Sequence, residues 1–347
     1  MNNKNNPVYP FSAIVGQKDM KDALLVNVVN PSIGGVLIKG EKGTAKSTAV
    51  RAIADLLPEK RTVKNCIFHC EAGQSRYLCP SCRKIIESGE TPEYEDIKMR
   101  VVELPISATE DRVAGTLDIE HAITKGEKKF EPGVLASANG NILYVDEVNL
   151  LDDHIVDLLL DAAAMGTNFV EREGISYSHP AKFMLVGTMN PEEGDLRPQL
   201  LDRFGLSVNV EGERDIGTRT DIIRKRLEFE KDPYAFCESY EQMQQETRDR
   251  IENAKAIIKE VEPDDLLLET SVKISLLLGV DGHRSDITFV KTSVTFAALN
   301  ERDEVMREDL IKAARLALPH RMRKLPFEDA KLEFDKVESV ISESYAK

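Results

Sequence analysis

A lysine and a serine follow a glycine-rich segment near the start of the chain. The segment GEKGTAKS (Gly40–Ser47) comes after the apolar run Val36–Ile38 and before an amphipathic stretch. Glycines leave backbone N–H groups free to wrap phosphates, while Lys46 can reach the terminal phosphates and Ser47 can hold magnesium. A chance glycine-rich turn is the alternative, but the strand before and the helix after favour a phosphate-binding loop. The predicted nucleotide-binding residues of this loop are Gly40, Glu41, Lys42, Gly43, Thr44, Ala45, Lys46, Ser47 and Thr48.

One position of this loop departs from the usual pattern. Such loops usually carry a glycine before the lysine, and this sequence has Ala45 there. We expect Ala45 to enter the first turn of the following helix. Alanine is a good helix former, so no unusual φ would be needed.

Two acidic residues end an apolar run roughly one hundred residues after the loop. In ILYVDE (Ile142–Glu147), Asp146 can hold hydrated Mg²⁺ and Glu147 can orient the attacking water, because both follow the carboxyl end of a predicted strand. A solvated strand end is the alternative. The distance from the phosphate-binding loop favours a catalytic pair.

A polar residue and two arginines follow the next predicted strand. FMLVGTMN ends on Asn190, which would lie beside the acidic strand and contact the γ-phosphate or the water. RPQLLDRF then supplies Arg197 and Arg203. An arginine provided in trans raises phosphoryl-transfer rates by about 10³–10⁵. A surface pair of Arg203 with Asp202, or of Arg197 with a glutamate, is the alternative.

Four cysteines lie between the loop helix and the next strand. In CIFHCEAGQSRYLCPSC, the spacing and Pro80 are typical of a knuckle that closes a tetrahedral Zn²⁺ site, and His69 could replace one sulfur. An iron–sulfur cluster and free or redox-active thiols stay open. Cys237 stands apart and is interpreted as an unpaired thiol. The candidate zinc ligands are Cys66, Cys70, Cys79 and Cys82.

The elements that must position these residues form an α/β pattern. Strands are expected at Val36–Ile38, Val101–Leu104, Ile142–Val145, Phe183–Val186 and Leu206–Val210, and helices such as Ile155–Ala164 lie between them. Alternating strands and helices indicate a parallel sheet covered on both faces.

The chain changes character after about residue 228, where only helical periodicity follows. Residues 1–228 are predicted as the ATPase core with a Cys-rich insertion at about 62–99. Residues 229–258 are predicted as a linker, around Glu230–Glu238, and a long helix. Residues 259–347 are predicted as a helical lid. Helices are expected at Tyr240–Val261, Leu266–Leu278, Asp286–Leu299 and Arg307–Leu318.

Composition narrows the class of protein. The formal net charge of −14 argues against a dedicated nucleic-acid binder, whose affinity comes from basic residues. The polar N-terminus has no apolar signal-peptide run, and no segment is apolar over a length that would span a bilayer. We therefore expect a cytoplasmic protein without membrane partners.

Taken together, these motifs resemble the AAA+ superfamily. The run from GNILYVDEVNLLDD through LVGTMNPEEGDLRPQLLDRFG, with PFSAIVGQ before it and LPHRMRKLPF after it, resembles more specifically the ATPase subunits I of magnesium chelatases. The resemblance implies an AAA+ P-loop domain with a parallel five-stranded sheet, β-hairpin insertions and a C-terminal all-helical lid. The insertions would span about Leu104–Lys129 and Asn168–Lys182.

The resemblance also implies roles for individual residues. Lys46 and Ser47 match the Walker A motif, and Asp146 and Glu147 match Walker B. Asn190 matches sensor 1, Arg203 the arginine finger and Arg284 sensor 2, although an ordinary surface charge is the alternative for Arg284. The segment that lines the adenine is matched by Val15, Gly16 and Gln17.

The function implied by the family is that of an ATP- and Mg²⁺-dependent motor subunit. It would form a homo-oligomeric, hexameric ring and work with a second AAA+ subunit carrying an adhesion-type domain. A large catalytic subunit would insert Mg²⁺, or Co²⁺ as in related enzymes, into a tetrapyrrole. The alternatives are a MoxR-like AAA+ chaperone that remodels a partner metalloprotein complex and, disfavoured by the net charge, a DNA translocase.

Overall fold

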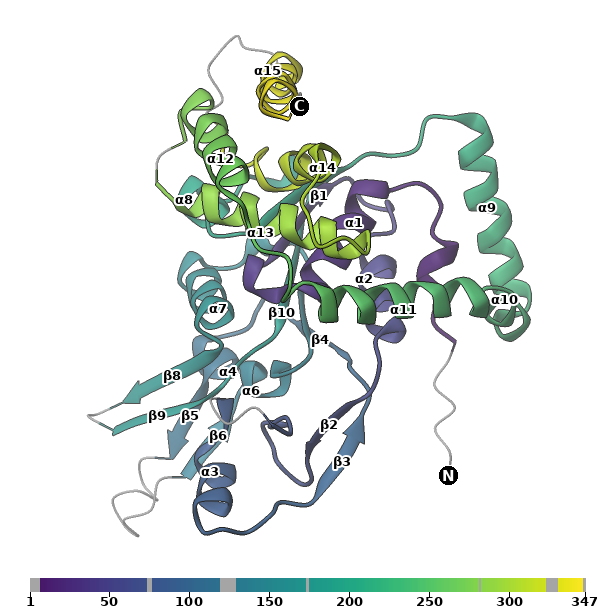
Figure 1. Ribbon diagram of the computed structural model, residues 1–347. Coiled ribbons are helices and arrows are strands. Elements are labelled where there is room, and N and C mark those ends of the chain that lie inside the picture. The colour runs from purple at the N-terminus through teal and green to yellow at the C-terminus, as the bar shows by residue number, and fades with distance from the viewer. Residues whose placement is uncertain are drawn as a thin grey trace. The chain divides into compact units, whose positions relative to one another are not determined.

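The computed structural model describes residues 7–73, 77–118, 129–172, 175–280, 282–322 and 330–345. The chain divides into two compact units, one of residues 1–44 and 197–347 and one of residues 45–196. Figure 1 shows the elements of both units. None of the described helices is both long enough and apolar enough to cross a membrane.

The central sheet has five strands in the order β11-β1-β10-β7-β4. Each defined register is parallel: β1 with β11, β10 with β7, and β4 with β7. All residues of β7 and β10 are buried, as expected for strands covered on both faces. The five strands predicted from the sequence are confirmed. Their bounds are Val36–Gly40 (β1), Val101–Leu104 (β4), Ile142–Val145 (β7), Met184–Met189 (β10) and Leu206–Val210 (β11).

In its described residues, the second unit adds helices and three two-stranded ribbons. The helices are α2 (Lys46–Leu56), α3 (Pro80–Glu87), α4 (Glu110–Ala114), α6 (Val134–Ala138) and α7 (Asp153–Met165). The ribbons are β2 (Lys60–Val63) with β3 (Tyr94–Ile97), β5 (Gly115–Asp118) with β6 (Lys129–Pro132), and β8 (Thr167–Arg172) with β9 (Ile175–Pro180).

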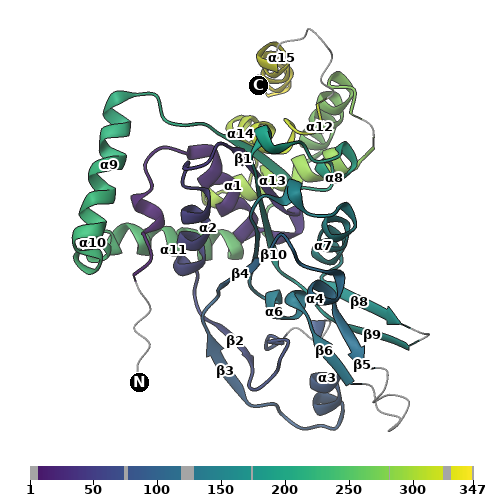
Figure 2. The ribbon, with the colours of Figure 1, turned by 180° about the vertical axis from the view of Figure 1, so that it is seen from behind.

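Both predicted hairpin insertions are present. The first is shorter than expected, because α4 occupies part of the range from Leu104 to Lys129 and the pairing starts only at Gly115. Its residues 119–128 lie outside the described part of the chain. Figures 1 and 2 both show β5–β6 and β8–β9 side by side, and β5 contacts β8.

The first unit carries the other helices of the described residues. They are α1 (Lys18–Val29), α8 (Pro198–Leu201), α9 (Ile216–Lys231), α10 (Pro233–Ser239), α11 (Glu241–Ile257), α12 (Asp265–Leu277), α13 (Arg284–Leu299), α14 (Arg307–Ala317) and α15 (Ala330–Ser344). Short 3-10 turns lie at Phe11–Ala13 and Pro31–Ile33 in this unit, and at Val148–Leu150 and Pro191–Glu193 in the second unit. The four helices predicted after residue 239 are confirmed.

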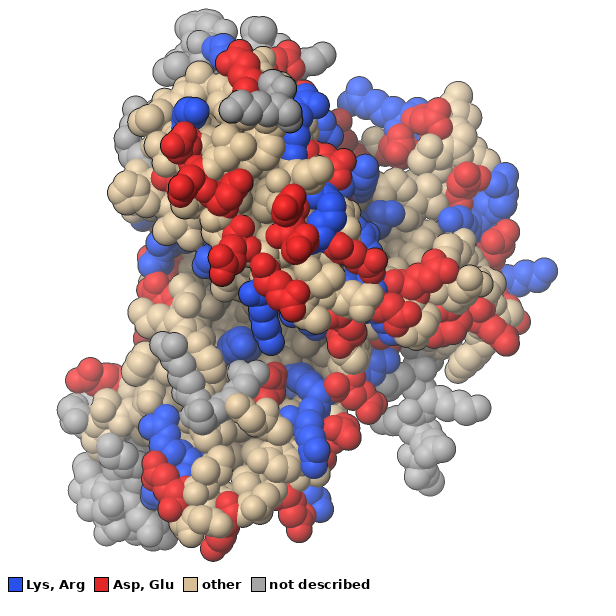
Figure 3. Space-filling view, in the orientation of Figure 1, with Lys and Arg blue, Asp and Glu red and all other residues tan. Residues whose placement is uncertain are grey.

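Aspartates mark where several of these helices begin. The Asp215, Asp232 and Asp264 carboxylates accept hydrogen bonds from the backbone N–H groups of the first turns of α9, α10 and α12. The stretch Glu230–Glu238 is therefore helical on both sides of Asp232. On the face in Figure 3, acidic and basic side chains are interspersed.

Candidate functional site

The phosphate-binding loop has the backbone that its glycines allow. A Cβ at Gly40 would run into the Val210 carbonyl on the paired strand β11. Gly43 has a φ of +83° with open space around it. The Thr44 hydroxyl donates to the Glu41 carbonyl at 2.8 Å, which closes the turn. The loop therefore has glycine at Gly40, where a side chain would clash, and at Gly43, where the backbone is left-handed.

The conformation of Ala45 differs from the one expected. Its φ of 62° and ψ of 18° are left-handed, and it caps α2, whose first residue is Lys46. The position thus precedes the helix and does not enter its first turn, so helix propensity does not explain it. A left-handed conformation costs a non-glycine residue about 1–2 kcal/mol. Lys46 and Ser47 lie at the N-terminus of α2, half-buried, where backbone N–H groups favour anions.

The acidic pair follows β7 as predicted. The Asp146 carboxylate accepts hydrogen bonds from Tyr144 Oη at 2.9 Å and from Thr188 Oγ1 at 2.5 Å. Glu147 is left-handed, with φ and ψ both 54°. Burial raises the pKa of Tyr144, so this hydroxyl stays protonated as a donor.

Asn190 lies next to the acidic strand. The register of β10 with β7 brings their carboxyl ends to one edge, and Asn190 follows β10 directly. Its side chain is only 6% exposed, and Oδ1 accepts from the Glu192 N–H at 3.3 Å. Helix N-terminus, hydroxyl, carboxylates and amide are the donor set that a magnesium nucleotide needs, so the residues fit that ligand.

Arg203 and Arg284 both belong to the first unit. Arg284 begins α13, and its Nη1 pairs with Asp202 Oδ2 at 3.3 Å, beside half-buried Arg203. The structure thus joins the predicted sensor residue to the segment of the predicted finger. The Asp202 carboxylate also faces Arg321 Nε at 3.4 Å.

Arg321 was missed by the sequence analysis as a site residue. Its guanidinium donates to the carbonyls of Asp202, Phe204 and Gly205 at 2.7–3.2 Å. Burial lowers the pKa of Arg321 to about 10, which leaves it charged at neutral pH. Neighbouring His320 contacts the Phe204 carbonyl through Nε2 at 2.9 Å, and burial holds its pKa well below 6.5. The basic run LPHRMRK was the available signal.

The predicted adenine segment forms a tight turn before α1. Gly16 and Gln17 both have positive φ, 66° and 48°, and Gln17 caps the helix. The Gln17 amide donates to the Glu211 carbonyl at 3.1 Å, and Val15 is half-buried. This fixes the turn in the same unit as β1 and β11.

The four predicted cysteine ligands converge. Their Sγ atoms all lie within 4.8 Å of one another, with Cys66 3.5 Å from Cys82 and 3.8 Å from Cys79. Zinc–sulfur bonds of about 2.3 Å in a tetrahedron imply sulfur separations of about 3.8 Å. Three of the thiols are buried, and His69 is not part of the group.

Backbone groups also point at the sulfurs. The Cys79 N–H donates to Cys70 Sγ at 3.2 Å, and the Cys82 N–H donates to Cys79 Sγ at 3.4 Å. Hydrogen bonds from the Cys70 and Cys79 thiols lower the pKa of Cys66, whereas burial raises that of Cys82. Cys237 is remote: its thiol donates to the Val8 carbonyl at 3.4 Å.

Aromatic rings connect the cysteine module, residues 66–82, to both hairpins. The Phe68 ring is 6.1 Å from that of Phe130 on β6, 6.4 Å from Tyr177 and 4.8 Å from His179, both on β9. His179 is buried and hydrogen-bonded to Asn168 at 3.0 Å, and Asn168 donates to the Ala114 carbonyl at 2.8 Å. Cysteines and hairpin rings therefore share one small core.

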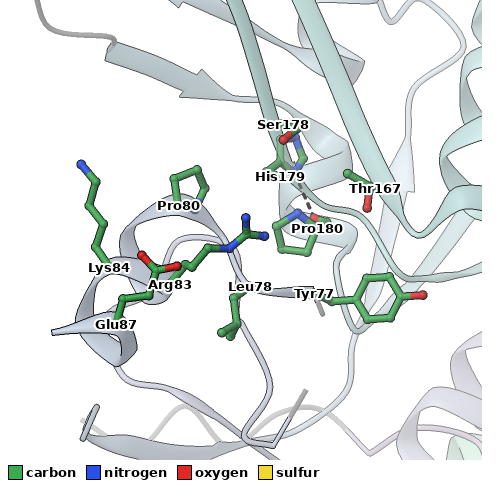
Figure 4. Close-up of a pocket in the computed structure, with 10 residues that line it drawn as sticks. All are labelled: Tyr77, Leu78, Pro80, Arg83, Lys84, Glu87, Thr167, Ser178, His179 and Pro180. Atoms are coloured by element: carbon green, nitrogen blue, oxygen red, sulfur yellow. Dashed lines mark hydrogen bonds between the residues drawn. The ribbon is translucent and has the colours of Figure 1, made fainter. Parts of the chain in front are cut away.

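A pocket of about 250 Å³ opens beside this core. Figure 4 shows Arg83, Lys84 and Glu87 of α3 on one side and Ser178, His179 and Pro180 of β9 on the other. His179 is engaged with Asn168 and with the Pro180 carbonyl, and burial lowers its pKa. It is therefore a neutral structural residue.

Known proteins resemble this chain over nearly its full length. Family models match an AAA domain (dynein-related subfamily) at residues 94–204 and an AAA lid domain at residues 268–340. A magnesium-chelatase subunit ChlI homolog of Methanocaldococcus jannaschii is 55% identical, covering 97% of this chain and 91% of its own. The magnesium-chelatase subunit ChlI of Trieres chinensis is 52% identical, and the match covers 93% of this chain and 92% of that protein.

Solved structures agree. A chain from the cryo-EM-based model of the complex between subunits BchI and BchD of magnesium chelatase is 47% identical, with a TM-score of 0.55, and the match covers 95% of this chain and 99% of that chain. With an AAA domain, an AAA lid and relatives of this identity, the chain belongs to the magnesium-chelatase subunit I family and is an AAA+ ATPase.

Proposed function

We propose that this chain is the ATP-driven ring subunit that powers insertion of a divalent metal ion into a tetrapyrrole by a separate catalytic subunit. The observation that carries ATP hydrolysis is the pairing of β7 and β10, whose carboxyl ends hold Asp146, Glu147 and Asn190 at one edge. The chelatase reaction rests on relatives that are named magnesium-chelatase subunits.

We assign the roles as follows. Lys46 and the loop backbone bind the phosphates, Ser47 and Asp146 hold the ion, and Glu147 orients the attacking water. Asn190 contacts the γ-phosphate or this water. Bound Mg²⁺ neutralises charge on the phosphates during transfer. Val15, Gly16 and Gln17 line the adenine, and Arg284 acts as the sensor of the lid.

The ring and its partners belong to the same proposal. Arg203 acts on the nucleotide of a neighbouring copy, so the site is completed between subunits of a hexamer. The similar solved chain comes from a complex of BchI with BchD. By analogy, this protein works with a second AAA+ subunit and a large catalytic subunit. The domain limits at 228 and 258 and the cytoplasmic location stay predictions.

The test of ATP hydrolysis is Lys46→Ala. We expect loss of ATP binding and turnover, because the lysine neutralises the terminal phosphates. Lys98→Ala is the matched control, since Lys98 forms an exposed pair with Asp55. Turnover at the control rate in Lys46→Ala would refute the site.

The test of the chelatase role is a pull-down from native extract with MgATP. We expect the second AAA+ subunit and the large catalytic subunit to be retained. Recovery of a different metalloprotein complex, without these two, would instead support the chaperone reading. The retained catalytic subunit, assayed with Mg²⁺ and Co²⁺ as substrates, decides which metal is inserted.

We also propose that Cys66, Cys70, Cys79 and Cys82 hold one structural Zn²⁺. The sulfur separations suit a single tetrahedral ion. Metal analysis of the purified protein should give one zinc per chain, and Cys79→Ser should lose it while Cys237→Ser retains it. One iron per chain, or no metal in the unaltered protein, would refute zinc.

A further inference from the structure

One buried hydroxyl bridges the two acids of the nucleotide site. Thr188 Oγ1 donates to Asp146 Oδ1 at 2.5 Å and accepts from the Glu147 backbone N–H at 3.3 Å. The Thr188 side chain is fully buried. Tyr144 Oη is a second donor to the same Asp146 oxygen, at 2.9 Å.

The bridge follows from strand register. Gly187 pairs with Val145, so the next residue along β10 comes level with Asp146 at the end of β7. The chain must turn sharply there, and Glu147 takes a left-handed conformation that is strained for a residue with a Cβ. A hydrogen bond to its N–H holds this conformation from the neighbouring strand.

We propose that Thr188 is a positioning residue for ATP hydrolysis, with Tyr144 as its auxiliary. The hydroxyl orients the Asp146 carboxylate as a donor and fixes the Glu147 backbone as an acceptor. Thr188 therefore sets both the metal-holding acid and the water-orienting acid. This inference rests on the roles proposed above for Asp146 and Glu147.

A threonine that only fills the core would give a different result on substitution. Valine has nearly the shape of threonine but can neither donate nor accept. Serine keeps the hydroxyl and loses only the methyl group. If Thr188 only packs in the core, Thr188→Val should disturb the protein less than Thr188→Ser. If Thr188 forms the bridge, Thr188→Ser should lower the rate of hydrolysis less than Thr188→Val.

The experiment compares Thr188→Val with Thr188→Ser. We expect Thr188→Val to lower kcat about 10- to 100-fold, the range for one hydrogen bond to a charged group. We expect it to raise the Mg²⁺ concentration for half-maximal activity, while binding of a fluorescent ATP analogue is retained. Thr188→Ser should restore most of kcat and the Mg²⁺ dependence. Tyr144→Phe should give a smaller change in the same direction, because one donor remains.

The outcomes distinguish failure of the bridge proposal from failure of the site assignment. Glu147→Gln is the reference variant and should be inactive. If Thr188→Val keeps the normal kcat and Mg²⁺ dependence while Glu147→Gln is inactive, the bridge is refuted and the site stands. If Glu147→Gln is active, the site assignment fails first. Should Thr188→Val not fold, an unchanged Mg²⁺ dependence in both Tyr144→Phe and Thr188→Ala would refute the proposal, and a raised requirement in both would support it.

Discussion

Strand β7 meets charged groups at its carboxyl end and neutral, buried amides at its amino end. At the carboxyl end, a strained glutamate and an aspartate are held by two hydroxyls. At the amino end, the Asn139 amide donates to the Phe68 carbonyl at 2.6 Å, and its Oδ1 accepts from the Lys182 N–H at 2.9 Å. The carboxyl end carries the acids proposed for ATP hydrolysis, while the amino end is hydrogen-bonded to the cysteine module.

This difference indicates that substitutions at the two ends of β7 should have different effects. Loss of a charged group at the carboxyl end should lower the rate of ATP hydrolysis and leave the buried core intact. Loss of a ring at the cysteine end removes buried apolar contacts and leaves the acids untouched. Substitutions at one end of β7 should therefore change the rate of ATP hydrolysis, and substitutions at the other end should change the stability of the fold. The following substitutions test this expectation.

The largest effect is expected from Arg203→Ala. ATP should still bind, and hydrolysis should fall by about 10³–10⁵, because an arginine finger stabilises the charge of phosphoryl transfer. Steady-state ATPase and nucleotide-binding assays measure this. Arg197→Ala is the matched control, since Arg197 is an exposed arginine on the same segment.

Mixed rings test whether Arg203 acts in trans. Arg203→Ala subunits retain Glu147, and Glu147→Gln subunits retain the finger. Mixing the two inactive variants should restore part of the activity. No activity at any mixing ratio would count against a site shared between copies.

A large change in stability without loss of rate is expected from Phe68→Ala. Phe68 is 2% exposed and packs against rings of both hairpins, so truncation should cost about 3–5 kcal/mol of unfolding free energy. Denaturant unfolding measures this, and hydrogen exchange should rise in β5–β6 and β8–β9. ATP turnover by the folded protein should be retained.

The neighbouring residue supplies the control for this packing argument. Ile67 is 56% exposed, so Ile67→Ala should change stability by no more than about 0.5 kcal/mol. Equal stability of the two variants would show that the Phe68 ring does not anchor the hairpins. A parallel loss of turnover in Phe68→Ala would show that the two ends of β7 are coupled.

The sequence predicted the polar residues at the carboxyl end of β7 because its signals are local. Apolar runs such as Ile142–Val145 mark buried strands, and polar residues directly after them must lie at the strand ends. The convergence of the four cysteines was equally local, since short turns bring them together. Their metal stays a prediction.

What the sequence did not predict depends on register and distant contacts. Thr188 becomes a bridge only because Gly187 pairs with Val145. Phe68 meets Phe130 and Tyr177, which lie more than sixty and one hundred residues away in the chain. No spacing rule in one strand or loop reports such partners. The prediction for Ala45 was wrong for another reason, because helix propensity was applied to a residue that lies just before the helix.

The smallest effect, and a favourable one, is expected from Ala45→Gly. Relief of the left-handed conformation should gain about 1–2 kcal/mol, while the freer unfolded chain of a glycine costs about 0.4–1 kcal/mol. The net gain should therefore be no more than about 1.5 kcal/mol, seen as a small rise in the denaturation midpoint. Ala49→Gly is the matched control, because Ala49 lies inside α2. No left-handed conformation is relieved there, so glycine should destabilise the protein by about 1 kcal/mol. A loss of equal size at both positions would mean that Ala45 is helical after all, and that the loop reaches the first turn of α2 without strain.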